Sequence, residues 1–183
     1  MKKTVLTFGI IAGLIISVLM DSSLLLAKWV GPGHSMAIGY TIMVASFLLV
    51  YFGIRSYRDN VLDGRISFGR AFACGLLITL ITTVFYVVSW EILYFNFIPH
   101  FMDSYFAAQI HQVQSSGLDP AVIATKVAAI QHSQQLYQNP FVNMAYTFIE
   151  PLPVGLIITL ISAAVLRRKS PVQPAATPAV MTT

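Results

Sequence analysis

Residues 71–97 read AFACGLLITLITTVFYVVSWEILYFNF, and this stretch decides the class of fold. Glu91 is its only charged residue, and the run is longer than the roughly 20 apolar residues with which an α-helix spans a bilayer. Three other stretches, 4–26, 36–54 and 141–166, have the same character. The sequence therefore predicts an all-α membrane protein with four transmembrane helices, in a single domain of residues 1–170.

The composition of the whole chain also indicates a lipid environment. Of the 183 residues, 56% are hydrophobic and 10% are charged, whereas a soluble domain carries about 25% charged residues. The single cysteine, Cys74, excludes an internal disulfide and a cysteine-framed metal site. The formal net charge is +4, but the basic residues lie in short clusters beside the apolar runs. They therefore indicate topology rather than binding of nucleic acid.

The basic residues predict the orientation, because cytoplasmic loops are enriched in Lys and Arg. Nine of the eleven fall on one side of the predicted spans: Lys2, Lys3, Arg55, Arg58, Arg65, Arg70, Arg167, Arg168 and Lys169. Only Lys28 and Lys126 fall on the other side, so both termini are expected in the cytoplasm. A cleaved signal peptide is the alternative for the first span. The apolar run exceeds the roughly 7 to 15 residues of such peptides, which favours a retained helix.

Residues 98–140 form the longest polar stretch and are expected on the outer side of the membrane. Gly117 interrupts this stretch, Asp119 is a suitable N-cap, and Pro120 suits the first position of a helix. A second helical run then ends at Asn139 and Pro140. The pattern predicts an outer helical hairpin. Residues 171–183 are rich in Pro, Ala and Thr and are expected to be disordered.

Three acidic residues, Asp21, Glu91 and Glu150, lie inside the predicted spans. At about 1.5 Å per residue they lie roughly 24 to 30 Å from the cytoplasmic helix ends, and therefore at similar heights. Intramembrane acids usually face the bundle interior or water, so these three are candidates for a proton- or cation-binding site. The alternative is that they join helices by hydrogen bonds or reach water at the interface.

The fourth predicted span carries two prolines beside its acid. Pro151 and Pro153 lack N–H groups, so the carbonyl groups of Thr147 and Ile149 lose their intrahelical partners. Freed carbonyl groups beside Glu150 are suited to hold a cation or water.

Small and hydroxyl side chains recur at helical spacing along the spans, which predicts close packing of helices. The faces are Gly9, Gly13, Ser17 and Asp21 in the first span, Gly75, Thr79, Thr83 and Glu91 in the third, and Thr147, Pro151, Gly155, Thr159 and Ala163 in the fourth.

Arg55, Arg58, Arg65 and Arg70 lie in the predicted cytoplasmic loop, where contact with anionic lipid headgroups explains them. The histidines fall on the outer side, and no two have the spacing that places metal ligands on one helical face. The sequence contains no His-Glu-x-x-His, no Gly-x-Ser-x-Gly and no phosphate-binding glycine loop. We therefore expect no enzymatic activity, no cofactor and no metal site.

Several segments together resemble the DUF4199 family of small bacterial membrane proteins, which is known largely from Bacteroidetes. They are FGIRSYRD (52–59), GRISFGRAF (64–72), the pair Asn139 and Pro140, TFIE (147–150), PVG (153–155) and LISA (160–163). The resemblance covers the chain from the first span to Lys169. It implies a multi-pass protein of the bacterial cytoplasmic (inner) membrane, and it supplies no catalytic residues.

Two functions follow from these features as expectations. The first is a small carrier or accessory protein in which Asp21, Glu91 and Glu150 form a proton or cation site. The second is a structural or assembly subunit whose outer hairpin binds a membrane protein partner. Acids that point into one cavity would favour the first function, and acids with separate contacts would favour the second. Four spans are few to enclose a pathway, so a homo-oligomer is an open alternative.

Overall fold

The computed structural model describes residues 1–30, 32–98 and 100–168, and for residues 25–30 and 32–36 it describes the backbone alone. All regular structure in these ranges is α-helical. The helices are α1 (Lys2–Val30), α2 (Pro32–Val61), α3 (Phe68–Asn96), α4 (Phe101–Gln114), α5 (Pro120–Tyr137), α6 (Pro140–Ile149) and α7 (Leu152–Leu166). The predicted tail of residues 171–183 and Lys169 lie outside the described residues.

Four segments are long and apolar enough to cross a membrane, which confirms the predicted number of spans. They are Lys2–Leu24, Ala37–Val61, Phe68–Asn96 and Pro140–Leu166, and the last combines α6 and α7. The second span ends later than the sequence suggested, at Val61 instead of Ile54. Residues 55–61 also stay helical, and Arg55 Nε lies 3.6 Å from Asp59 Oδ2 one turn away, a pairing that favours the helix.

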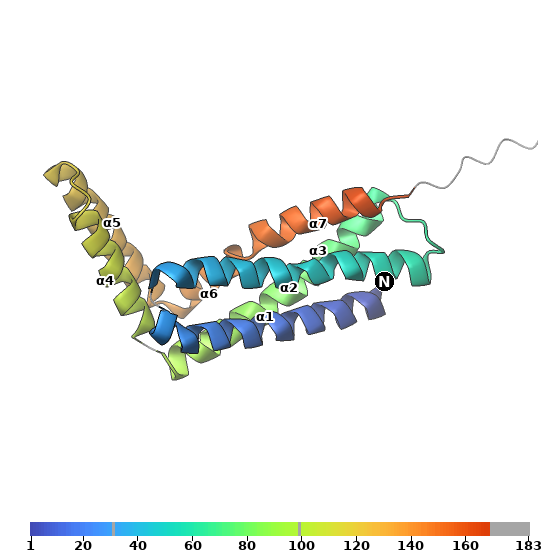
Figure 1. The fold of residues 1–183 in the computed structure, drawn as a ribbon, viewed down its shortest axis with the longest axis horizontal. Coiled ribbons are helices and arrows are strands. Elements are labelled where there is room, and N and C mark those ends of the chain that lie inside the picture. The colour runs from blue at the N-terminus through green and yellow to red at the C-terminus, as the bar shows by residue number, and fades with distance from the viewer. Residues whose placement is uncertain (31, 99, 169–183) are drawn as a thin grey trace, which may run out of the picture.

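A short loop joins α2 to α3 and also meets the end of α7. Asp63 and Gly64 have φ values of 50° and 78°, and Ser67 caps α3 by accepting a hydrogen bond from the Arg70 N–H. The Arg168 N–H donates to the Ile66 carbonyl at 3.0 Å. The start of α3 and the end of α7 therefore lie at one end of the bundle, where Figure 1 also shows the N-terminus.

Helices α1 and α3 run parallel and pack through small residues. A Cβ atom on Gly9 would lie 2.9 Å from Ile81, and one on Gly13 would overlap Phe85 one turn further along both helices. The Ser17 hydroxyl donates to the Phe85 carbonyl at 3.4 Å. The predicted small-residue face of the first span is thus the surface that packs against α3.

Helices α3 and α7 run antiparallel, and each places a threonine against a glycine of the other. A Cβ atom on Gly75 would lie 2.8 Å from Thr159 Cγ2, and one on Gly155 would overlap Thr79. The hydroxyl groups of Thr79 and Thr159 lie 3.0 Å apart and are fully buried. This interlocked pair of faces holds the fourth span in the bundle.

Helices α4 and α5 form an arm that leans away from the bundle at the end opposite the N-terminus (Figure 1). The turn between them contains Gly117 with a φ of 68°, and Asp119 caps α5 by accepting from the Ala121 N–H at 2.8 Å. The Gln134 side chain donates to Asp103 at 3.2 Å and joins the two helices. The predicted cap at Asp119, with Pro120 in the first turn, is confirmed.

Candidate functional site

The fourth span breaks at Glu150, between α6 and α7. Pro151 is the residue that breaks it, because it cannot donate to the Thr147 carbonyl. Pro153 lies in the first turn of α7, where an N–H group needs no intrahelical partner. The Tyr86 hydroxyl of α3 donates to Glu150 Oε2 at 3.2 Å. Glu150 is exposed at the bundle surface, whereas Thr147 and Pro151 are buried.

An aromatic cluster lies beside this break and holds the root of the arm. It consists of Trp90, Tyr94, Phe101, Phe106, Tyr137 and Tyr146. Trp90 stacks on Tyr94 with ring centroids 5.8 Å apart and meets Phe101 edge-on at 6.0 Å. Tyr137 meets Tyr94 at 5.9 Å and Phe106 at 6.1 Å. Because these rings come from α3, α4, α5 and α6, they fix the arm against the bundle.

A fully buried amide, Asn143 of α6, lies next to this cluster. Trp90 Nε1 donates to Asn143 Oδ1 at 3.1 Å, and the Thr147 hydroxyl donates to the same oxygen at 3.2 Å. An indole N–H can only donate, so it fixes which end of the amide faces α3. Asn143 Nδ2 has no hydrogen-bond partner among the described residues.

Tyr137 is the last residue of α5 and the centre of the cluster. Burial raises the pKa of its phenol to about 12, although the polar groups of Thr147 and Trp90 act in the opposite direction. The phenol therefore stays protonated and can donate a hydrogen bond at neutral pH.

Asp21 lies in a different place, in a hollow of about 170 Å³ between α1 and α3. Its two carboxylate oxygens each lie 3.1 Å from the Ser89 hydroxyl. The other residues that line the hollow are Ile92, Leu93 and Phe97.

Glu91 has a third environment. Its Oε1 atom is buried and has no hydrogen-bond partner in the part of the chain that the structure describes. Glu91 follows Ser89 by two residues, which places them about 200° apart around α3, so Glu91 faces away from Asp21. The structure thus gives each acid its own surroundings. No three His, Cys, Asp or Glu side chains of the described residues lie close enough to hold a metal ion.

The four arginines also differ. Arg58 is 9% exposed and makes protein contacts, with Nε 2.6 Å from Asp59 Oδ1. Arg55 approaches the same aspartate but stays exposed, and Arg65 and Arg70 are exposed too. The side chains of Arg55, Arg65 and Arg70 are therefore accessible from outside the protein. The Arg58 guanidinium instead makes its contacts within the protein.

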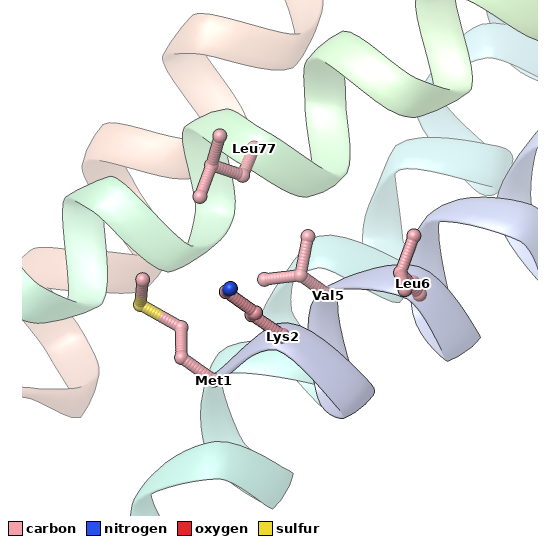
Figure 2. A pocket seen from close by; sticks show the side chains of 5 residues that line it. All are labelled: Met1, Lys2, Val5, Leu6 and Leu77. Atoms are coloured by element: carbon pink, nitrogen blue, oxygen red, sulfur yellow. The ribbon is translucent and has the colours of Figure 1, made fainter.

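A second hollow, of about 260 Å³, lies where the start of the chain meets α3. Figure 2 shows Met1, Lys2, Val5 and Leu6 on the side that faces Leu77 of α3. The lining of the hollow is apolar, and none of the predicted acids contributes to it.

The acids could be identified from the sequence, but the α3 side chains that contact Glu150, Asp21 and Asn143 could not. Tyr86, Ser89 and Trp90 come from α3, and a single apolar span gives no signal that singles them out. Asn143 had a signal, because a side-chain amide within an apolar run needs a buried partner. Such a pattern identifies a residue as important, but it does not identify the side chain that the residue contacts.

Comparison with known proteins identifies the family. The family model described as "Protein of unknown function (DUF4199)" matches residues 7–168. No curated protein and no solved structure matches the chain. The match covers most of the chain and agrees with the resemblance seen in its sequence segments. The chain therefore belongs to the DUF4199 family.

Proposed function

We propose that the protein is a structural or assembly subunit of a membrane complex, without enzymatic activity, which binds a helical protein partner through the α4–α5 arm. The observation that carries this proposal is that α5, 18 residues long and rich in Ala, Val and Ile, has no buried residue. Exposed apolar helix surface normally marks a binding surface.

The exposed surface of α5 has two chemically different flanks. The apolar flank contains Val122, Ala129 and Leu136, which follow one another every seventh residue and are exposed. The polar flank contains Gln131 and Gln135, on the other side of the face that packs on α4. Seven-residue spacing is the pattern of a helix that packs along another helix. The apolar flank is therefore the surface we assign to the partner.

The charge and rigidity of the arm suit such a partner. Its charged side chains are Asp103, Asp119 and Lys126, so a neutral helix can approach without repulsion. The aromatic cluster holds Tyr137 at the root of α5. A surface that is already ordered loses little conformational entropy on binding.

The placement in the membrane follows from the basic residues. Arg58, Arg65 and Arg168 lie at the end of the bundle away from the arm, and such clusters mark the cytoplasmic side. We infer that the arm is on the outer face of a bacterial cytoplasmic membrane. The acids support this structural function, since Asp21 contacts Ser89, Glu150 contacts Tyr86, and Glu91 shares a site with neither.

The experiment is site-specific photocrosslinking in native membranes. A photoreactive residue at Val122 or Leu136 is compared with one at Gln131 or Gln135, which are also exposed and serve as controls. We expect a discrete adduct from the apolar flank and none from the polar flank. The mass of the adduct distinguishes a second copy of this chain from another protein. Equal labelling from both flanks, or none from either, would overturn the proposal.

A proton or cation site at Glu150 is the second candidate function. It is supported by the exposed carboxylate at a proline-broken span, which Tyr86 holds by a hydrogen bond. Proton and cation flux into liposomes tests it, with Glu150→Gln compared with the native protein and with Glu91→Gln. Flux that only Glu150→Gln abolishes would establish this function. No flux under any gradient would dismiss it.

A further inference from the structure

We propose that the hollow between α1 and α3 binds an organic ammonium group at the level of the outer lipid headgroups. The proposal is independent of the partner-binding arm. It rests on the residues that line the hollow, Asp21, Ser89, Ile92, Leu93 and Phe97, and on the height of the hollow in the bundle.

The polar side of the hollow is a carboxylate that is held in place and open to a ligand. The Ser89 hydroxyl lies 3.1 Å from both oxygens of Asp21, but its single hydrogen can be donated to only one of them at a time. The other oxygen keeps its lone pairs for a donor in the hollow. The Ser89 hydroxyl adds no positive charge, so a cation is the complementary ligand for this pair.

The apolar side of the hollow selects the kind of cation. Metal ions require several oxygen or nitrogen ligands, and within the described ranges no three acidic, His or Cys side chains gather to supply them. An alkylammonium needs one or two acceptors and gains from apolar walls, which Ile92 and Leu93 provide. The ring of Phe97, 71% exposed, offers a face to a cation. These features together fit an alkylammonium.

The height of the hollow points to a lipid as the source. Lys28 is the next charged residue after Asp21 and follows it about 10 Å further along α1, at 1.5 Å per residue. The third span ends at Asn96, and Phe97 follows directly. Because Phe97 lines the hollow, the hollow reaches the end of the third span and so the headgroup region, where phosphatidylethanolamine carries a primary ammonium. A soluble alkylamine has the same chemistry, and the experiment separates the two sources.

The lipid arm of the test uses native mass spectrometry of the purified protein with equal amounts of phosphatidylethanolamine and phosphatidylglycerol. We expect preferential binding of phosphatidylethanolamine. Loss of a charge-assisted hydrogen bond in Asp21→Asn should weaken this binding about tenfold. Ser89→Ala keeps the charge and should weaken it less. Glu91→Gln, the matched control on another face of α3, should bind like the native protein.

The soluble arm measures the thermal unfolding midpoint in ethylammonium chloride against sodium chloride at equal concentration. A higher midpoint in ethylammonium that Asp21→Asn abolishes shows a site open to water as well as to lipid. Phosphatidylethanolamine preference without this shift assigns the site to the lipid headgroup alone. No preference and no shift in the native protein would overturn the proposal, as would equal losses in Asp21→Asn and Glu91→Gln.

Discussion

The guanidinium group of Arg58 donates a hydrogen bond to the Leu166 carbonyl, with Nη1 and the oxygen 3.4 Å apart. This contact joins the end of α2 to the last turn of α7, where helix carbonyl groups lack intrahelical partners. A cation at this position also faces the negative end of the α7 dipole. Arg58 therefore has a role in the fold beyond its contribution to the positive charge at this end of the bundle.

Arg58→Met should lower the free energy of unfolding by about 1 to 3 kcal/mol, because the Leu166 carbonyl and Asp59 each lose a charged donor. Arg55→Met removes the same charge from the same helix, but Arg55 is exposed, so its effect should stay below about 0.5 kcal/mol. The measurement is unfolding in sodium dodecyl sulfate. Equal losses in the two variants would mean that the charge matters and the contact does not.

Gly155→Ala should destabilise the bundle by about 1 to 3 kcal/mol, because the new Cβ atom would overlap Thr79. Thr79→Ser keeps the hydroxyl and removes the methyl group, so it should recover part of this loss when combined with Gly155→Ala. Gly39→Ala is the matched control, since a Cβ atom there meets nothing within 4 Å. The unfolding midpoints of the native protein and of these three variants give the comparison, and a Gly155→Ala protein as stable as Gly39→Ala would contradict it.

Trp90→Phe should cost about 1 to 2 kcal/mol, because the buried Asn143 amide then loses its donor from α3. Asn143→Leu in the same chain removes the amide, whose oxygen then keeps only Thr147 as a donor, so the double variant should be no less stable than Trp90→Phe alone. A double-mutant cycle in detergent micelles measures this coupling. Additive losses would show that the two side chains act independently.

Tyr137→Phe should remove a pH dependence at alkaline pH. The folded protein raises the pKa of this phenol to about 12, mainly through burial, whereas an unfolded tyrosine titrates near about 10. The proton is thus held more tightly in the folded state, and its contribution to stability is complete below about pH 10 and is lost as pH rises towards 12. The difference in unfolding midpoint between pH 9 and 11.5 should be larger for the native protein than for Tyr137→Phe. Identical differences would place the titration elsewhere.

The number of spans could be predicted from the sequence because hydrophobic length alone determines it. The α5 cap at Asp119 could be predicted because a cap depends on neighbouring residues. The end of α2 at Val61 was missed, since the sequence pattern located the apolar run and the helix continues beyond it through polar residues such as Arg55 and Asp59.

The surroundings of the acids could not be predicted in the same way. Asp21, Glu91 and Glu150 have similar heights, which suggested a shared site. The direction in which each side chain points depends on helix rotation, and the packing of Gly13 against Phe85 and of Gly155 against Thr79 sets that rotation. These contacts join residues about 70 positions apart in the chain, and no local pattern encodes them.

The interlocked faces of α3 and α7 have a consequence for how the chain is made. The ribosome releases the fourth span last, so a nascent chain that has already inserted α1, α2 and α3 leaves Thr79 without its contacts on α7. The Thr79 hydroxyl, which is fully buried in the finished bundle, then lacks its partner Thr159 and faces lipid. Membrane chaperones and proteases that respond to polar groups in lipid would thus distinguish a stalled or truncated chain from the complete one. Only the insertion of α7, which carries Thr159 and Gly155, buries this hydroxyl group.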